Sequence, residues 1–256
     1  MAVLPIACFA GLMIYLGQRL VRSGLDSDGA ELWLGLCFVP VGIAIVVRFS
    51  LATGLDLGST GPVVNLIAQG VLHFGIACFG AFVWRTFRPA DNWGRSLFLL
   101  IVGVYTLNLA LFGITGAHAS QSHPFNLVLS ACLSLVFGWA FVEALLYYES
   151  MRRRMGLGLA DPVITNRFLL FALWTGGMML LPLTVTAVRV VSMISTDQSF
   201  FEATPAGLAV KPAAAWTIQV IRSAVLVIGI PMLSGIWLAF FPPRRYTSWL
   251  KARAAV

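Results

Sequence analysis

Apolar segments of about twenty residues recur along almost the whole chain, and this pattern restricts its fold more than any other feature. A helix needs about 20 mostly apolar residues to cross the ~30 Å hydrocarbon layer of a bilayer. Of the 256 residues, 59% are hydrophobic and only 11% are charged. This composition is typical of a polytopic membrane protein and argues against a soluble globular domain.

Seven segments are candidates for transmembrane helices. No run of residues alternates between apolar and polar over the length of a barrel strand, so helices are the expected spanning elements. The expected spans are residues 2–16, 32–51, 62–84, 96–115, 126–148, 168–194 and 213–241. The sequence therefore predicts an all-α membrane protein, with a seven-transmembrane-helix bundle over residues 1–241 and a short basic tail over residues 242–256.

The basic residues are divided unequally between the segments that connect these spans. Thirteen of the 17 lysine and arginine residues fall in one alternating set of connections, whereas the other set holds Lys211 alone. The positive-inside rule assigns the basic set to the cytoplasm. We therefore expect a multi-pass protein of the cell inner membrane, with its N-terminus outside and its C-terminus in the cytoplasm.

This distribution also indicates which partners to expect. The formal net charge of +7 is explained by topology and by contact of the loops with anionic lipid headgroups of the bilayer. The basic residues are scattered over short loops and form no extended face, so we expect no binding of nucleic acid. A protein partner on the cytoplasmic side or within the membrane is a further expectation, because this sequence shows no kinase or cyclase domain next to the helices.

Three arginines, Arg48, Arg189 and Arg222, lie inside apolar segments. At a rise of 1.5 Å per residue, all three are about 24–32 Å above the expected cytoplasmic boundary, close to the outer interface. In one interpretation, they reach out to lipid phosphates. In the other, they form a periplasm-facing anion site together with Gln219, because a guanidinium group suits a carboxylate or a phosphate.

Glu143 lies deeper, about 9 Å inside the cytoplasmic boundary of the fifth span. A carboxylate within a membrane needs a partner and usually faces the interior of the bundle. Arg85, Arg19 and Gln18 are the candidate partners at this depth. Glu143 is either a structural group bonded to a neighbouring helix or a functional proton or cation site.

A third polar set begins with Asn65, Gln69 and His73, which recur every four residues and so share one face of the third span. Asn108 in the fourth span is expected at the same level as His73. These side chains either form hydrogen bonds between helices or line a polar cavity that holds a ligand or a water wire. Titration of His73 would suit a proton relay.

Motifs for catalysis and for cofactor binding are missing. The sequence has no H-E-x-x-H, G-x-S-x-G, Walker or dinucleotide-binding pattern, and its four cysteines show no C-x-x-C spacing. His118 and His123 share a loop with no acidic residue, which is weak support for a metal site. We therefore expect no catalytic residues, no bound metal and no cofactor.

Seven helices with the N-terminus outside resemble the general plan of rhodopsins and seven-helix receptors. Attachment of retinal would require a lysine midway along the last helix, and residues 213–241 contain none. The stretches ELWLGLCF, LADPVITNRFLLFALW and FFPPRRY are similar to those of uncharacterised bacterial seven-helix membrane proteins, some of which resemble sensor modules of signalling proteins. This resemblance implies a sensor and offers no catalytic residues to carry over.

The leading interpretation is a bacterial inner-membrane sensor or ligand-binding protein. It would accept a small anionic or lipidic ligand from the outer side and act through a partner. A small-solute or proton-coupled transporter using His73, Asn108 and Glu143 is the alternative, although no two-fold repeat of the kind common in transporters is evident. A structural subunit of a membrane complex is the third interpretation, and an integral-membrane enzyme is the least supported.

Overall fold

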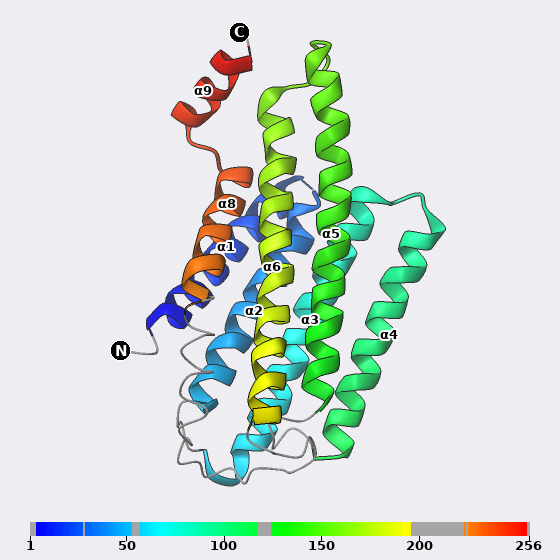
Figure 1. Ribbon diagram of the computed structural model, residues 1–256, viewed down its shortest axis with the longest axis vertical. Helices are drawn as coiled ribbons and strands as arrows, with labels where there is room; N and C mark the ends of the chain where they lie inside the picture. Colours follow the sequence, from blue (N-terminus) through cyan, green and yellow to red (C-terminus); the bar gives the residue numbers. More distant parts are fainter. Residues whose placement is uncertain are drawn as a thin grey trace.

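The computed structural model of the chain describes residues 4–27, 29–52, 57–116, 124–195, 223 and 225–254, and every regular element in these ranges is a helix. The helices lie side by side in an elongated bundle (Figure 1). Among the described residues, five helices are long and apolar enough to cross a membrane, or up to six if one bent pair counts as a span. The expectation of an all-helical membrane bundle is confirmed at this level.

The helices follow the expected spans closely in the middle of the chain and depart from them at its ends. The expected first span ended at residue 16, whereas α1 continues to Ser27 because Leu20 in its extra turns is fully buried. Beyond residue 241, where only a tail was expected, the chain forms a further helix bent by 78° from the one before. The elements are α1 (Leu4–Ser27), α2 (Glu31–Ala52), a 3-10 turn (Gly58–Thr60), α3 (Gly61–Phe87), α4 (Asn92–Ile114), α5 (Pro124–Gly156), α6 (Pro162–Ser195), a π-helical turn (Val225–Gly229), α8 (Ile230–Phe240) and α9 (Arg244–Ala254).

Local sequence accounts for several of the helix ends. The Asp161 carboxylate accepts a hydrogen bond of 2.8 Å from the backbone N–H of Val163, and Pro162 is the first residue of α6. Both features are typical of a helix N-terminus. Pro231 is the second residue of α8, and the π-helical turn lies directly before this helix. Because proline has no backbone N–H, the regular hydrogen-bond ladder cannot continue through it.

Glycines bring α1 and α2 into close contact. Gly17 and Gly24 on α1 are seven residues apart, as are Gly35 and Gly42 on α2, so each pair lies on one helix face. A Cβ atom on Gly35 would lie 2.7 Å from the backbone nitrogen of Val21 and 2.8 Å from the carbonyl oxygen of Gly17. The two backbones therefore meet at a distance that only glycine permits.

Replacing Gly35 with alanine is expected to lower the free energy of unfolding by about 1–3 kcal/mol, because the added methyl group overlaps a backbone that cannot move aside. Gly103 is the matched control, since nothing lies within 4 Å of a Cβ placed there. Gly103→Ala is expected to be neutral or slightly stabilising. Melting can be followed by the reaction of the buried Cys37 and Cys78 with a fluorogenic maleimide on heating. Equal melting temperatures for the two variants would contradict the prediction.

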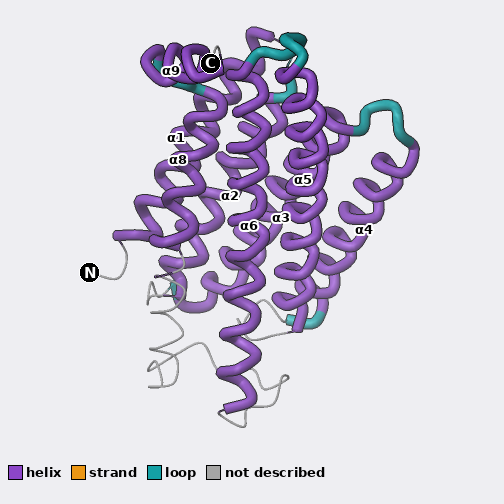
Figure 2. The backbone as a smooth tube through the Cα atoms, turned by 45° about the horizontal axis from the view of Figure 1, so that its top comes forward, coloured by secondary structure: helices purple, strands orange, loops and turns teal. Residues whose placement is uncertain are grey.

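The basic residues of the connecting segments lie at one end of the bundle. The ends of α1, α3 and α5 and the whole of α9 lie towards the upper end of the bundle in Figure 1. The thirteen basic residues of the connecting segments belong to these helix ends, to α9, to the turn after α3 and to the starts of α4 and α6. Figure 2 shows the loops gathered at the two ends of the bundle. The charge asymmetry expected from the sequence is thus a property of one end of the folded bundle.

Candidate functional site

The polar face of α3 points into the bundle. Asn65, Gln69 and His73 are buried, with exposed fractions of 9%, 1% and 5%. The Nδ1–H group of His73 donates a hydrogen bond of 2.6 Å to the carbonyl oxygen of Gln69, one turn earlier. In a neutral imidazole this leaves Nε2 as an acceptor.

Tyr105 of α4 completes this polar face, and the sequence interpretation did not include it. Its ring meets the His73 ring edge to face at a centroid distance of 5.0 Å, and only 2% of the residue is exposed. Tyr105 lies three residues before Asn108 and so shares its side of α4. That spacing was the available clue.

Asn108 of α4 is also buried. The residue after it, Leu109, lies beside Gly70 of α3, where a Cβ atom would be 3.7 Å from Leu109 Cδ2. Asn108 Nδ2 donates a hydrogen bond of 3.3 Å to the carbonyl oxygen of Phe125 at the start of α5. Asn108 therefore links α4 to α5.

Gln69, His73 and Tyr105 together form what we call the α3–α4 polar cluster. Both polar atoms of the Gln69 amide, Nε2 of His73 and the hydroxyl of Tyr105 are buried and have no hydrogen-bond partner in the described part of the chain. An unpaired buried polar group costs about 1–3 kcal/mol, so native proteins rarely retain several together without a use for them. The cluster offers hydrogen-bond donors and acceptors that a small polar molecule can satisfy.

The predicted outer anion site is only partly covered by the structure. Arg48 is half-buried near the end of α2. Arg222 and Gln219 lie outside the described residues. Arg189 belongs to α6, and its side chain lies outside the described part of the structure.

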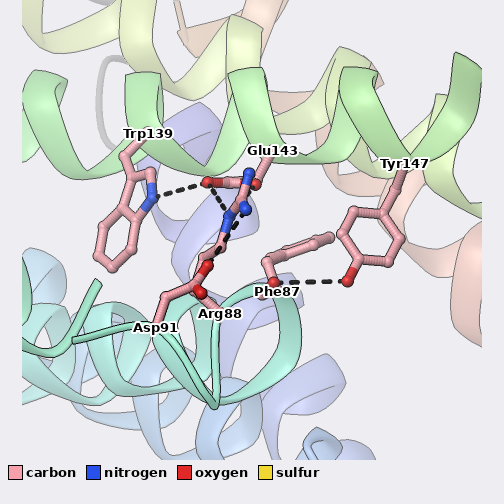
Figure 3. Close-up of polar contacts among 6 residues, drawn as sticks. All are labelled: Phe87, Arg88, Asp91, Trp139, Glu143 and Tyr147. Carbon is pink, nitrogen blue, oxygen red and sulfur yellow. Dashed lines mark hydrogen bonds and ion pairs between the residues drawn. The ribbon is translucent and has the colours of Figure 1, made fainter. Parts of the chain in front are cut away.

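Glu143 is the centre of a second polar site, at the other end of α3 (Figure 3). It is only 2% exposed, and the Nε–H of Arg88 donates to its two carboxylate oxygens at 2.9 and 3.0 Å. The indole N–H of Trp139, one turn earlier on α5, donates to Oε1 at 3.3 Å. Arg88 also donates a bond of 3.2 Å to Asp91. The Arg88–Glu143 pair therefore ties α5 to the turn between α3 and α4.

The partner of Glu143 is not one of the three candidates from the sequence. Arg85 instead stacks on Trp33 at 4.5 Å, and Arg19 lies over the ring of Trp237. Arg88 is one of the thirteen basic residues of the connecting segments. It directly follows the end of α3, and the turn there brings it against α5. The hydrogen bond that Arg88 donates to Glu143 raises the pKa of Arg88; partial burial opposes this shift and the bond to Asp91 adds to it. The guanidinium group thus stays charged at physiological pH.

The structure divides the predicted intramembrane polar residues between two places. His73 and Arg88 are fifteen residues apart in the sequence. At the rise of an α-helix, this corresponds to about 22 Å along the axis of α3. Glu143 therefore does not belong to the α3–α4 polar cluster. Among the described residues, no group of three or more His, Cys, Asp or Glu side chains could hold a metal ion. His118 and His123 lie outside the described residues.

The two polar sites differ in what they can do chemically. The Arg88–Glu143 pair is satisfied within the protein, which suits a structural tie, whereas the α3–α4 polar cluster has atoms available for a ligand.

Comparison of the chain with protein-family models, with curated protein sequences and with solved structures found no match.

Proposed function

We propose that this chain is a seven-helix sensor or ligand-binding protein of the bacterial inner membrane, and that its ligand binds at the α3–α4 polar cluster. The observation that carries the proposal is the convergence of three buried side chains on α3 and α4. Within the described residues, the Gln69 amide, Nε2 of His73 and the Tyr105 hydroxyl have no hydrogen-bond partner. The ligand is a small polar molecule with both donor and acceptor groups.

The membrane placement in this proposal rests on the helices and on the charge. The outward sides of the helices carry exposed apolar residues, such as Leu99, Leu100 and Leu107 on α4, which suit contact with lipid. The concentration of basic residues at one end supports a cytoplasmic position for that end. Seven spans with the N-terminus outside follow if α1 and residues 213–241 also cross the bilayer.

The connections of the cluster suggest how binding is transmitted. The cluster lies between α3 and α4, and Arg88 couples the turn that joins these helices to Glu143 on α5. A ligand that changes the spacing of α3 and α4 would therefore move the end of α5. That end carries Arg152, Arg153 and Arg154, all exposed. We propose that a protein partner binds at this basic end and reads the change.

Replacing Gln69 with leucine is expected to raise the stability of the bundle by about 1–3 kcal/mol, because two unpaired buried polar atoms are removed, while ligand response is lost. Melting measures the first effect. Water is the probe for the second effect. Radiolysis labels His73 and Tyr105 when water lies beside the cluster, and the variant should lose that labelling. Gln18→Leu, on the exposed side of α1, is the control and should change neither. A less stable Gln69→Leu variant would show that the amide has a structural partner.

A photo-crosslinking residue at position 154 in the native membrane tests the sensor itself. We expect a cross-linked partner whose yield changes in Gln69→Leu and stays constant in Gln18→Leu. A partner captured equally by both variants would favour a structural subunit.

His73 gives the transporter alternative its specific support, so proton flux should be measured with an internal pH dye in proteoliposomes. Proton flux through the parent protein that disappears in His73→Phe would support a proton-coupled permease and contradict the sensor.

A further inference from the structure

A groove opens on the edge of the bundle between α1 and α8, which lie side by side in Figures 1 and 2. Its volume is about 320 Å³, and its lining is apolar apart from Ser234. Leu16 and Leu233 form a buried floor, whereas Leu12 and Tyr15 on the rim are about half exposed. A slot of this kind, open to the outside of a membrane bundle, suits an acyl chain.

The end of the groove nearer the basic loops is aromatic and positively charged. Tyr15 stacks on Trp237 with ring centroids 5.7 Å apart, and both residues line the groove. One turn beyond Tyr15, the guanidinium carbon of Arg19 lies 4.9 Å from the Trp237 ring centroid and 4.4 Å from that of Phe241. Within the described residues, no carboxylate forms an ion pair with Arg19. Stacking on the rings holds the guanidinium group in place while its N–H donors can bind an anion.

Helix α9 adds further positive charge beside Phe241. It starts with Arg244 and Arg245 and turns away from α8 by 78°. Tyr246 and Trp249 stack on each other, and Trp249 is half exposed. Basic residues next to exposed aromatic rings on a helix that runs across the bundle are typical of a helix lying in the headgroup layer.

We propose that the groove between α1 and α8 binds an anionic phospholipid, with one acyl chain along the apolar slot and the phosphate on Arg19. This inference rests on the membrane placement in the proposed function and is independent of the α3–α4 polar cluster. Charge complementarity supports it, because the groove is apolar along its length and cationic at one end, as a lipid is apolar along its tails and anionic at its head. A partner helix is about 10 Å wide, too wide to enter a slot between two helices in contact.

Native mass spectrometry of the purified full chain tests the inference. The chain is incubated with equal amounts of phosphatidylglycerol and phosphatidylcholine that carry the same acyl chains. We expect retained phosphatidylglycerol to exceed phosphatidylcholine about fivefold or more, the effect of one basic residue near an anionic headgroup, and Arg19→Gln to remove this preference. Arg95→Gln is the matched control, because Arg95 is exposed at the same end of the bundle on α4. Ser234→Trp fills the slot and should reduce retention of both lipids.

Each contrary outcome identifies a different occupant or none. Equal losses in Arg19→Gln and Arg95→Gln would mean general attraction of anionic lipid to the surface, and equal retention of the two lipids would exclude a headgroup site. Displacement of phosphatidylglycerol by inorganic phosphate would indicate an anion site without a chain. A dimer that is lost in Ser234→Trp would assign the groove to a second copy. Gln69→Leu should leave lipid retention unchanged, so failure of this inference leaves the polar cluster untouched.

Discussion

Replacing Arg88 with alanine is expected to lower the free energy of unfolding by about 3–5 kcal/mol, because the buried Glu143 carboxylate loses its ionic partner. The Trp139 indole N–H, at 3.3 Å, is the remaining donor that the structure gives to this carboxylate, and one neutral donor does not replace a guanidinium group. The melting temperature should fall by about 10 °C. The thiol-reactivity assay on Cys37 and Cys78 measures it, with the exposed Cys8 replaced by serine.

Two further variants separate the buried ion pair from ordinary surface charge. Asp91→Asn should cost less than about 1 kcal/mol, because the Asp91 side chain is 42% exposed and its pair with Arg88 is screened by water. Combining Arg88→Met with Glu143→Leu should restore most of the stability, since neither charge is then left buried. If Arg88→Ala melts at the same temperature as Asp91→Asn, the pair does not hold α5 to the α3–α4 turn.

Trp174→Ala is expected to have the next largest effect, about 3 kcal/mol. Trp174 is fully buried on α6, and its ring meets Phe38, Phe79 and Phe137 at centroid distances of 5.2, 5.5 and 5.6 Å. These contacts join α6 to α2, α3 and α5 at one point, so the lost side chain leaves a cavity shared by four helices. This loss of unfolding free energy is at the lower end of the range for buried aromatic residues in soluble proteins. The reason is that the Trp174 side chain would otherwise contact lipid instead of water, so the hydrophobic effect contributes little.

Trp174→Ala removes a tryptophan, so the intrinsic fluorescence of the variant is not comparable with that of the parent protein. Melting is therefore again followed by cysteine reactivity. Trp249→Ala removes the same side chain from a half-exposed position on α9 and should melt within about a degree of the parent protein, as surface substitutions do. Trp174→Phe should lie between the two, since most of the ring contacts are retained. A Trp174→Ala protein as stable as Trp249→Ala would mean that the bundle closes over the cavity.

The spans could be predicted because hydrophobicity and length alone identify a membrane helix. Helix α2, expected at residues 32–51, was found at Glu31–Ala52. Which side of a helix faces the interior is much harder to predict, since lipid and protein core are equally apolar. The four-residue spacing of Gln69 and His73 indicates one polar face on α3, and the three-residue spacing of Tyr105 and Asn108 places both on one side of α4. Neither spacing indicates that these two faces meet.

The partner of Glu143 shows a second limit. Helical rise predicts the depth of Glu143, and it predicts as partners the residues that lie at that depth on straight helices. Arg88 directly follows the end of α3, and the path of the turn there decides which residues its long side chain reaches. A turn of four residues is set by details of backbone geometry that hydropathy does not contain. The extra turns of α1 up to Ser27 have a similar origin, since contacts with α2 stabilise them outside the apolar segment.

The glycine contact between α1 and α2 has a consequence for assembly. In a bilayer, each helix forms before the helices associate, so the backbone freedom of Gly17 and Gly35 is already lost when the two helices meet. Glycine has no rotamers to restrict, and long side chains lose up to about 2 kcal/mol of conformational entropy when they are buried. The α1–α2 pair can therefore associate with almost no loss of side-chain entropy at its closest contacts. This makes it the natural first pair to form, against which α3 and the later helices pack.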